Sequence, residues 1–227
     1  MRPTSVMVFA AGFGTRMGAL TRSQPKPMIS VAGMPLIDHA LQLVDGQDLD
    51  PVVVNLHYLP DQIRLHLAER NVLFSDESQE ILETGGGLKA ALPLLGSGPV
   101  LTMNTDAVWA GPNPVPLLLD AWDPTRMDAL LMCVPRENAV GHLGQGDFVL
   151  NQGYLTRGPG AVYTGIQIIK TDLLAQIPNK AFSLNLLWNR MLADGRAFGL
   201  SYPGKWCDVG HPEGILLAEE MLRDADV

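Results

Sequence analysis

The sequence predicts an α/β protein with a Rossmann-like, mixed but mostly parallel sheet flanked by helices, and three observations support this fold class. Short apolar segments rich in β-branched residues alternate with segments whose apolar residues recur at helical spacing. This alternating order is typical of parallel strands that helices cover on both faces. A glycine-rich stretch directly follows the first apolar segment, at the position where ligands bind in open α/β sheets.

The first half of the chain shows the alternation most regularly. Strands are predicted at Ser5–Ala10, Pro51–Leu56, Asn71–Glu77 and Pro99–Ala107, and helices at Pro35–Val44, Leu59–Arg70 and Gly87–Leu95. Pro35 stands at the expected first turn of its helix, where a missing N–H group breaks no helical hydrogen bond. Four strands separated by helices favour a parallel arrangement in this half.

The second half is less regular. Strands are predicted at Asp128–Pro135 and Tyr163–Lys170, a β-hairpin at Asp147–Thr156, a helix at Phe182–Gly195, and a strand end followed by a terminal helix at Lys205–Leu222. No repeat, low-complexity tract or linker separates the two halves. We therefore expect residues 1–227 to form a single domain with the hairpin as a small lobe.

Composition limits the possible functions. The chain has 227 residues and a formal net charge of -8, which argues against a nucleic-acid partner. Its apolar segments are too short to cross a bilayer, so no membrane partner is expected. The two cysteines, Cys133 and Cys207, lie far apart in apolar segments and are expected to be buried thiols. These features favour a cytoplasmic protein that is a monomer or a weak homo-oligomer.

The glycine-rich stretch FAAGFGTRMG predicts a phosphate-binding loop. Gly12 and Gly14 allow backbone N–H groups to approach phosphate oxygens, and Arg16 and Lys26 supply cations nearby. The stretch is not a dinucleotide fingerprint, because Met17 occupies the position of the third glycine, and it lacks the GK[ST] of a P-loop. On the two glycines alone, a plain tight turn between strand and helix is almost as good an interpretation.

The extended pattern is more specific. A-A-G-x-G-T-R-M, L-T, P-K-P and V-x-G-x-P-L-I together resemble the N-terminal signature of the sugar-1-phosphate nucleotidylyltransferases. Three later blocks, LETGGGLKAALPLL, MNTDA and KWCDVGHPEGILLAEEML, resemble that family's further motifs in the same order. The resemblance covers nearly the whole chain and is greatest to the short MurNAc-1-phosphate uridylyltransferases of cell-wall recycling. It implies the nucleotide-diphospho-sugar transferase type of fold.

The resemblance implies an Mg²⁺-dependent enzyme whose partners are an NTP and a sugar 1-phosphate. The nucleotidyl group, from UTP by preference, would pass to the sugar 1-phosphate, MurNAc-1-phosphate by preference, and pyrophosphate would leave. Because two polyanions must meet, charge neutralisation and positioning are expected to dominate catalysis.

The resemblance also implies roles for individual residues. Arg16 is expected on the terminal phosphates and Lys26 between the nucleotide and sugar phosphates, while Asp106 and Asp208 would hold Mg²⁺, which prefers oxygen ligands. The expected nucleotide-binding residues are Ala11, Gly12, Gly14, Thr15, Glu83, Gly85, Gly86 and Asn104. The expected residues around the sugar phosphate are Asn138, Gly146, Asn151, Thr164 and Gly165.

The sequence departs from the family pattern at three places, and several functions remain open. Thr105 replaces the usual Gly or Ser before the metal-binding aspartate, Ala19 stands where many relatives have Pro, and GPGAVYTG lacks the E-K-P segment of larger members. The alternatives are a mannose-1-phosphate guanylyltransferase, a phosphocholine cytidylyltransferase, or a catalytically silent regulatory module of the same fold. A dinucleotide-dependent dehydrogenase is disfavoured by the glycine spacing.

Overall fold

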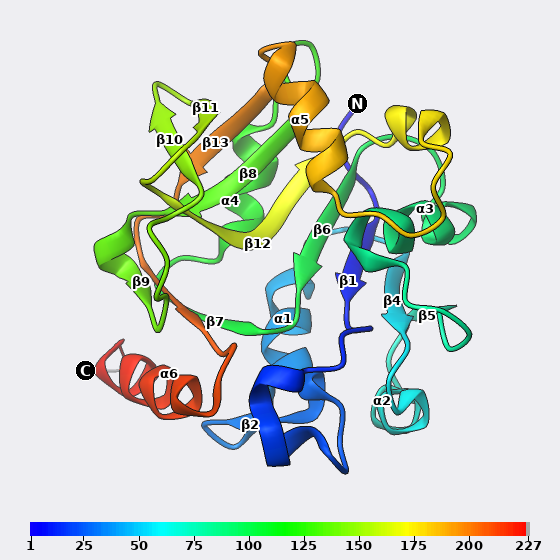
Figure 1. The fold of residues 1–227 in the computed structure, drawn as a ribbon, viewed down its shortest axis with the longest axis vertical. Coiled ribbons are helices and arrows are strands. Elements are labelled where there is room, and N and C mark those ends of the chain that lie inside the picture. The colour runs from blue at the N-terminus through cyan, green and yellow to red at the C-terminus, as the bar shows by residue number, and fades with distance from the viewer. Residues whose placement is uncertain (226–227) are drawn as a thin grey trace.

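The computed structural model of the protein describes residues 1–225, and a nine-stranded mixed sheet forms its centre (Figure 1). The strand order is β10 (Phe148–Asn151), β11 (Tyr154–Arg157), β13 (Ala197–Ser201), β8 (Ala129–Val134), β12 (Val162–Ile169), β6 (Val100–Asn104), β1 (Val6–Phe9), β4 (Val52–Leu56) and β5 (Leu73–Asp76). The mixed sheet of the sequence prediction is confirmed.

The parallel part of the sheet consists of β6, β1, β4 and β5, together with the pair β8–β13. The other neighbours in the sheet run antiparallel. Strand β1 lies between β4 and β6, with Val8 opposite both Val54 and Met103. Because β1, β4 and β6 are parallel, their carboxyl ends meet at one edge, and the loops that follow them come together there.

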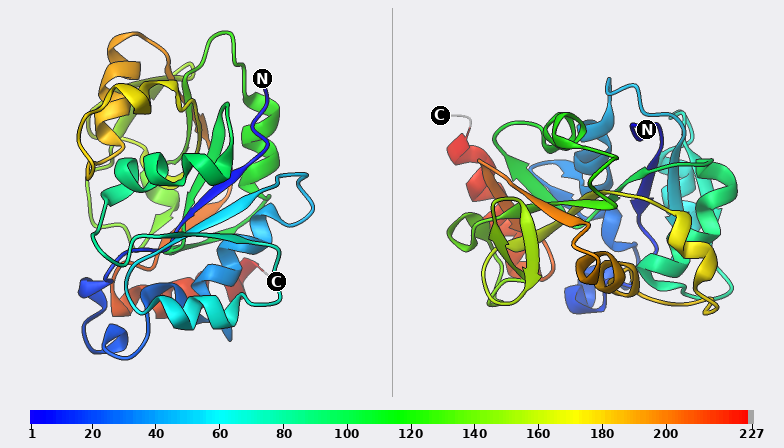
Figure 2. Two further views of the ribbon diagram at one scale, coloured as in Figure 1. Left: turned by 90° about the vertical axis from the view of Figure 1, so that its right-hand side faces the viewer. Right: turned by 90° about the horizontal axis from the view of Figure 1, so that it is seen from above.

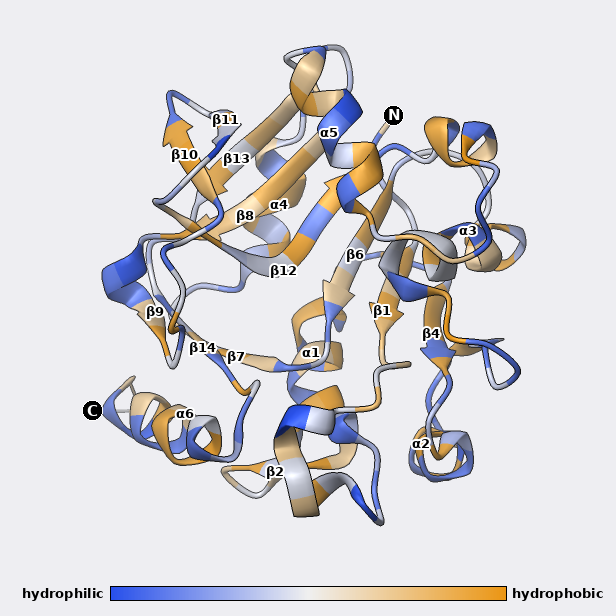
Figure 3. Cartoon of the chain, in the orientation of Figure 1, coloured by the Kyte–Doolittle hydropathy of each residue, from blue (hydrophilic) through white to orange (hydrophobic). Residues whose placement is uncertain are grey.

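Helices cover both faces of the sheet (Figure 2). The helices are α1 (Leu36–Val44), α2 (Pro60–His66), α3 (Glu83–Leu95), α4 (Pro114–Ala121), α5 (Asn185–Ala193) and α6 (Pro212–Ala225). Alternation along β1 directs Val6 and Val8 to the core under α1 and α4, and Met7 to the core under α3 and α5. The strands are accordingly apolar on both faces (Figure 3).

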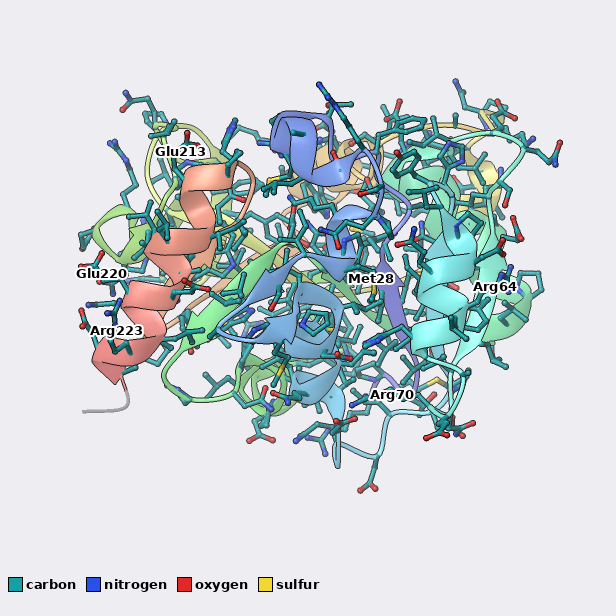
Figure 4. All side chains as sticks on the ribbon, turned by 90° about the horizontal axis from the view of Figure 1, so that it is seen from below. Met28, Arg64, Arg70, Glu213, Glu220 and Arg223 are labelled. Carbon is teal, nitrogen blue, oxygen red and sulfur yellow. The ribbon has the colours of Figure 1, made fainter. Side chains whose placement is uncertain are left out.

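A smaller sheet joins the carboxyl end of β6 to the C-terminal segment. It has the order β7 (Ala107–Ala110), β14 (Lys205–Asp208) and β9 (Ala139–Val140), with β14 antiparallel to β7 and parallel to β9. Helix α6 packs Ala218 and Met221 against this region, while its charged Glu213, Glu220 and Arg223 point away from it (Figure 4). None of the described helices combines the length and the apolar composition that a bilayer span requires.

The remaining elements are short. They are the strand pair β2 (Ser30–Val31) and β3 (Met34–Pro35), and the 3₁₀ helices η1 (Thr15–Thr21), η2 (Lys26–Met28), η3 (Arg136–Asn138) and η4 (Asp172–Gln176). The thiols of Cys133 and Cys207 are buried and unpaired, as the sequence predicted.

The structure corrects the sequence prediction at three elements. Helix α3 begins at Glu83 instead of Gly87, so the expected loop is the first turn of the helix. Helix α4 was not predicted, because Pro114 and Pro116 are typical of loops; both lie in its first turn, where no helical hydrogen bond is lost. Strand β13 was not predicted either, and it connects the predicted hairpin β10–β11 to the main sheet.

Two neighbouring leucines of α5 test the packing of this helix. Leu187 is fully buried, whereas Leu186 is 45% exposed. Leu187→Ala is expected to lower the free energy of unfolding by about 2–5 kcal/mol, and Leu186→Ala to change it by less than about 0.5 kcal/mol. Urea denaturation followed by circular dichroism measures both, and equal losses would contradict the described orientation of α5.

Candidate active site

A cleft opens where the carboxyl ends of the parallel strands meet. It is lined by the segment after β1, the start of η2, the ends of β4 and β5, the start of α3, and the turn between β6 and β7. The predicted residues that line it are Ala11, Gly12, Lys26, Glu83, Asn104 and Asp106. Three motifs far apart in the sequence therefore form one site.

The glycine loop fixes the position of Lys26. Gly14 has a φ of +63°, and a Cβ atom there would stand 2.8 Å from the Cβ atom of Lys26. The Thr21 hydroxyl donates a hydrogen bond to the Gly14 carbonyl oxygen at 3.1 Å and holds the turn closed. Glycine at position 14 is thus required both by the backbone conformation and by the close approach of the lysine.

Lys26 forms an ion pair inside the cleft. Its Nζ atom donates to Oδ2 of Asp106 at 3.0 Å, and only 10% of the lysine side chain is exposed. Pro25 precedes it in an extended conformation and Pro27 follows it in η2, so the backbone on both sides of the lysine is restricted. The ammonium group is held at the cleft instead of extending into solvent.

The two aspartates predicted to bind the metal are neighbours in space. Asp106 lies in the bend between β6 and β7, and Asp208 ends β14. The antiparallel pairing of these strands places Asp208 opposite Ala107, and the Val209 N–H group donates to the Asp106 carbonyl oxygen at 2.8 Å. The pKa of Asp208 is raised, first by burial and then by the charge of Asp106, while Lys26 and Arg16 act in the opposite direction.

Arg16 adjoins the second aspartate. A Cβ atom on Gly210 would stand 3.1 Å from Nη1 of Arg16 and 2.9 Å from Oδ1 of Asp208. The missing side chain at position 210 therefore lets the guanidinium and the carboxylate approach each other. Two cations and two carboxylates are combined in this corner, although the chain as a whole carries a net charge of -8.

The donor set fits Mg²⁺. Within residues 1–225, no three His, Cys, Asp or Glu side chains converge in the manner of a complete protein metal site. Two adjacent carboxylates leave several coordination positions for water and phosphate oxygens. This is the usual way in which Mg²⁺ is bound in enzymes that act on phosphates.

Thr105, which departs from the family pattern, has a structural contact. Its hydroxyl group donates to the Phe9 carbonyl oxygen at 2.9 Å, and the residue is buried. This bond ties the turn that carries Asp106 to the end of β1. The added side chain thus lies within the fold and leaves Asp106 beside the cleft.

The predicted glycine loop on the other side of the cleft has a packing role. The N–H groups of Gly85 and Gly86 donate to the Phe182 carbonyl oxygen at 2.8 and 3.0 Å. A Cβ atom on Gly85 would stand 2.4 Å from the Phe182 ring. These N–H groups are therefore engaged within the protein, whereas Glu83 and Thr84 line the cleft.

The residues predicted around the sugar phosphate do not line this cleft. The Thr164 hydroxyl donates to the Met132 carbonyl oxygen at 2.8 Å inside the sheet. Gly165 has a φ of +85°, and its Cβ atom would stand 2.8 Å from Nδ2 of Asn104, so this glycine makes room for the asparagine. The other three lie in η3, in the loop before β10 and at the end of β10: Asn138, Gly146 and Asn151.

Two buried polar residues of the cleft were missed by the sequence analysis. The Ala10 N–H group donates to Oδ1 of Asn55 at 2.7 Å, and Nδ2 of Asn55 donates to Oε1 of Glu77 at 2.8 Å. Both side chains are only 3% exposed and line the cleft. The sequence did contain a signal for both residues: each is a polar residue at the carboxyl end of an apolar strand, at the edge of the sheet where the glycine loop also lies.

A family model matches most of the chain. Residues 6–194 match the model of the MobA-like NTP transferase domain. The chain belongs to this family. The matched range of the MobA-like domain contains Lys26 and Asp106, and Asp208 follows it in the smaller sheet.

Two relatives of this MobA-like chain carry the same enzyme name. It is 41% identical to N-acetylmuramate alpha-1-phosphate uridylyltransferase of Caulobacter vibrioides, over 98% of each chain. It is 32% identical to the enzyme of the same name from Neisseria meningitidis serogroup B, over 90% of this chain and 92% of the relative. Among solved structures, HddC from Yersinia pseudotuberculosis, complexed with GMP-PN, has the same fold, with a TM-score of 0.77 and 21% identity over 97% of this chain and 99% of HddC.

The contact between Gly14 and Lys26 can be separated from backbone strain. Gly14 and Gly195 both have positive φ, +63° and +64°, but only at position 14 would a Cβ atom strike a neighbour, 2.8 Å from the Cβ atom of Lys26. Both alanine variants are expected to lose about 1–2 kcal/mol of stability through strain, and Gly14→Ala at least about 1 kcal/mol more through overpacking. Urea denaturation measures this difference. Equal losses of stability in the two variants would mean that the Lys26 side chain moves aside without an energetic cost.

Proposed function

We propose that the protein transfers a uridylyl group from UTP to the phosphate of MurNAc-1-phosphate. In this reaction a phosphate oxygen of the sugar 1-phosphate forms a bond to the α-phosphorus of UTP. The bond from that phosphorus to the bridging oxygen breaks, and pyrophosphate leaves with the electron pair. The observation that carries the proposal is the meeting of Lys26, Arg16, Asp106 and Asp208 at the carboxyl edge of the parallel strands.

The chemistry requires positioned charge more than proton transfer. A phosphate nucleophile is already ionised at neutral pH, so no general base is required. Lys26, held at the cleft beside Asp106, would bind the phosphate oxygens on which negative charge accumulates. Arg16, beside Asp208, would bind the terminal phosphates that leave as pyrophosphate.

We propose Mg²⁺ as the cofactor, held by Asp106 and Asp208. When bound, the ion supplies positive charge that offsets the repulsion between the two phosphate groups. Asp106 directly precedes β7 and Asp208 ends β14, its neighbour in the smaller sheet, so two paired strands fix the positions of both carboxylates.

The choice of substrate rests on the relatives. Both N-acetylmuramate alpha-1-phosphate uridylyltransferases match nearly the full chain, and they are 41% and 32% identical to it. The mannose-1-phosphate guanyltransferase of Hypocrea jecorina is 26% identical, and this chain covers 62% of it. Length and identity therefore favour the uridylyltransferase.

A matrix of substrates tests the proposed reaction. Pyrophosphate release is measured with Mg²⁺ for four NTPs against MurNAc-1-phosphate, GlcNAc-1-phosphate, mannose-1-phosphate and phosphocholine. The expected result is the highest kcat/KM with UTP and MurNAc-1-phosphate. A higher value for another pair would contradict the proposed substrates, and no release from any pair would contradict the enzymatic role.

Removing one carboxylate tests the proposed metal site. Asp106→Asn is expected to lower kcat for pyrophosphate release by at least about 100-fold, because it removes a charged metal ligand and the partner of Lys26. Asp120→Asn is the control, since this aspartate is 78% exposed and pairs with Arg2. An Asp106→Asn variant with the wild-type rate would contradict the assignment, provided that its circular dichroism spectrum is unchanged.

A further inference from the structure

Arg157 is a cation that the proposed reaction does not use, and the structure holds its guanidinium group in one position. The group stacks on two aromatic rings, with Cζ 4.8 Å from the centre of the Phe148 ring and 5.6 Å from that of the Trp188 ring. Its Nη2 atom donates to Oδ1 of Asn185 at 2.5 Å and to Oδ1 of Asn189 at 3.2 Å. Stacking and two amide oxygens thus orient the planar cation before any ligand binds.

No acid of the described residues pairs with this cation. Arg157 takes part in none of the ion pairs between residues 1 and 225, and its Nε and Nη1 atoms donate to no protein group there. Partial burial lowers the pKa of the guanidinium, while the charge of Asp147 acts in the opposite direction, and an arginine keeps its charge in proteins. Because the residue is exposed, an anionic ligand can reach the free N–H groups.

The start of α5 brings Arg157 to the wall of the cleft. The Leu184 N–H group, directly before α5, donates to Oγ1 of Thr84 at 3.0 Å, and Thr84 lines the cleft. The next residue is Asn185, which accepts from Arg157. Figures 1 and 2 show α5 between the hairpin β10–β11 and α3, on the same face of the sheet. The α3 wall of the cleft therefore continues through the start of α5 to the arginine.

Strand β12 makes a second connection between the cleft and Arg157. A Cβ atom on Gly165 would stand 2.8 Å from Nδ2 of Asn104, which lines the cleft. Tyr163 lies two residues earlier on the same strand, and its ring centre is 4.9 Å from that of Trp188, on which Arg157 stacks. A substrate that extends from the cleft along β12 toward α5 would therefore meet the guanidinium group.

The proposed acceptor carries a group that such a cation can recognise. MurNAc differs from GlcNAc by a lactyl ether on O3, and this ether ends in a carboxylate. The chain has a net charge of -8, and Glu83 and Asp106 line the cleft, so a carboxylate on the sugar would be repelled unless a cation lay beside it. Lys26 and Arg16 are already assigned to phosphates. Of the four acceptors in the substrate matrix, MurNAc-1-phosphate alone contains a carboxylate.

We propose that Arg157 is a specificity-determining residue that binds the lactyl carboxylate of MurNAc-1-phosphate. This inference rests on the proposed function and adds the group that selects the acceptor sugar. Asn185 and Asn189 are positioning residues, because they hold Nη2 and leave Nε and Nη1 to the substrate. Phe148 and Trp188, which are 1% and 8% exposed, support the guanidinium from the core.

The test compares UDP-MurNAc with UDP-GlcNAc, two ligands that differ only in the lactyl group. Calorimetry measures the Kd of each for the full chain with Mg²⁺ and without pyrophosphate, so that no turnover occurs. The wild type is expected to bind UDP-MurNAc about tenfold or more tightly than UDP-GlcNAc. Arg157→Gln is expected to bind UDP-MurNAc about tenfold or more weakly than the wild type does, and UDP-GlcNAc within about threefold of it.

Two further variants separate charge recognition from other effects. Arg157→Lys keeps the charge but lacks the planar stacking group, and it is expected to retain part of the preference for UDP-MurNAc. Arg126→Gln is the matched control, since Arg126 is also exposed and stacks on an aromatic ring, that of Phe198 at 5.4 Å. This control is expected to keep the wild-type preference. In the pyrophosphate assay, kcat/KM of Arg157→Gln is expected to fall for MurNAc-1-phosphate and to stay unchanged for GlcNAc-1-phosphate.

The outcomes distinguish failure of this inference from failure of the proposed function. Equal loss of affinity for both ligands in Arg157→Gln would overturn the inference, because it would assign Arg157 to a phosphate or to packing. Unchanged affinity for both ligands would overturn it as well, and either result leaves the proposed uridylyl transfer intact. If Arg157→Gln does not fold, as judged by circular dichroism, Arg157→Lys supplies the same comparison. A wild type without any preference for UDP-MurNAc or MurNAc-1-phosphate would contradict the proposed substrate, and the inference with it.

Discussion

The pairing of β14 with β7 is the contact on which the site depends. It brings Asp208 beside Asp106 across about 100 residues of chain, and the same ladder positions Gly210 next to Arg16. At the other end of this strand pair the two backbones also approach closely, since a Cβ atom on Gly204 would stand 2.3 Å from the Ala110 carbonyl oxygen. The second carboxylate of the proposed metal site is thus supplied by a strand pair outside the main sheet.

The ion pair between Lys26 and Asp106 explains how an acidic protein can present a cation to polyanions. A lysine that is 10% exposed loses hydration, and the carboxylate at 3.0 Å compensates for this loss. The pair therefore keeps Lys26 inside the cleft before any phosphate is bound. Since the Asp106 side chain is 31% exposed, its carboxylate remains accessible while it holds the lysine.

The sequence allowed the prediction of features that depend on short segments. The strand before the glycine loop and the aspartate after β6 follow from local pattern and motif, and the structure places both at the cleft. Asn55 and Glu77 were missed because their role arises only when β1, β4 and β5 pair side by side. Helix α4 was missed because Pro114 and Pro116 favour a loop when only the local sequence is considered. In the structure, the core buries Val115 and Leu118 of this segment and thereby stabilises the helix.

The three glycines of LETGGG show that a motif can be recognised from the sequence while the packing role of its residues becomes visible only in the structure. Each glycine allows a close approach by a different neighbour: Gly85 by the Phe182 ring, Gly86 by the Lys180 carbonyl oxygen, and Gly87 by the Glu77 carboxyl group. The motif therefore acts through packing, because it brings the start of α3 and a buried acid to the wall of the cleft. The residues of this region that line the cleft are Glu83, Thr84 and Glu77, and they differ in chemistry from the glycines that position them.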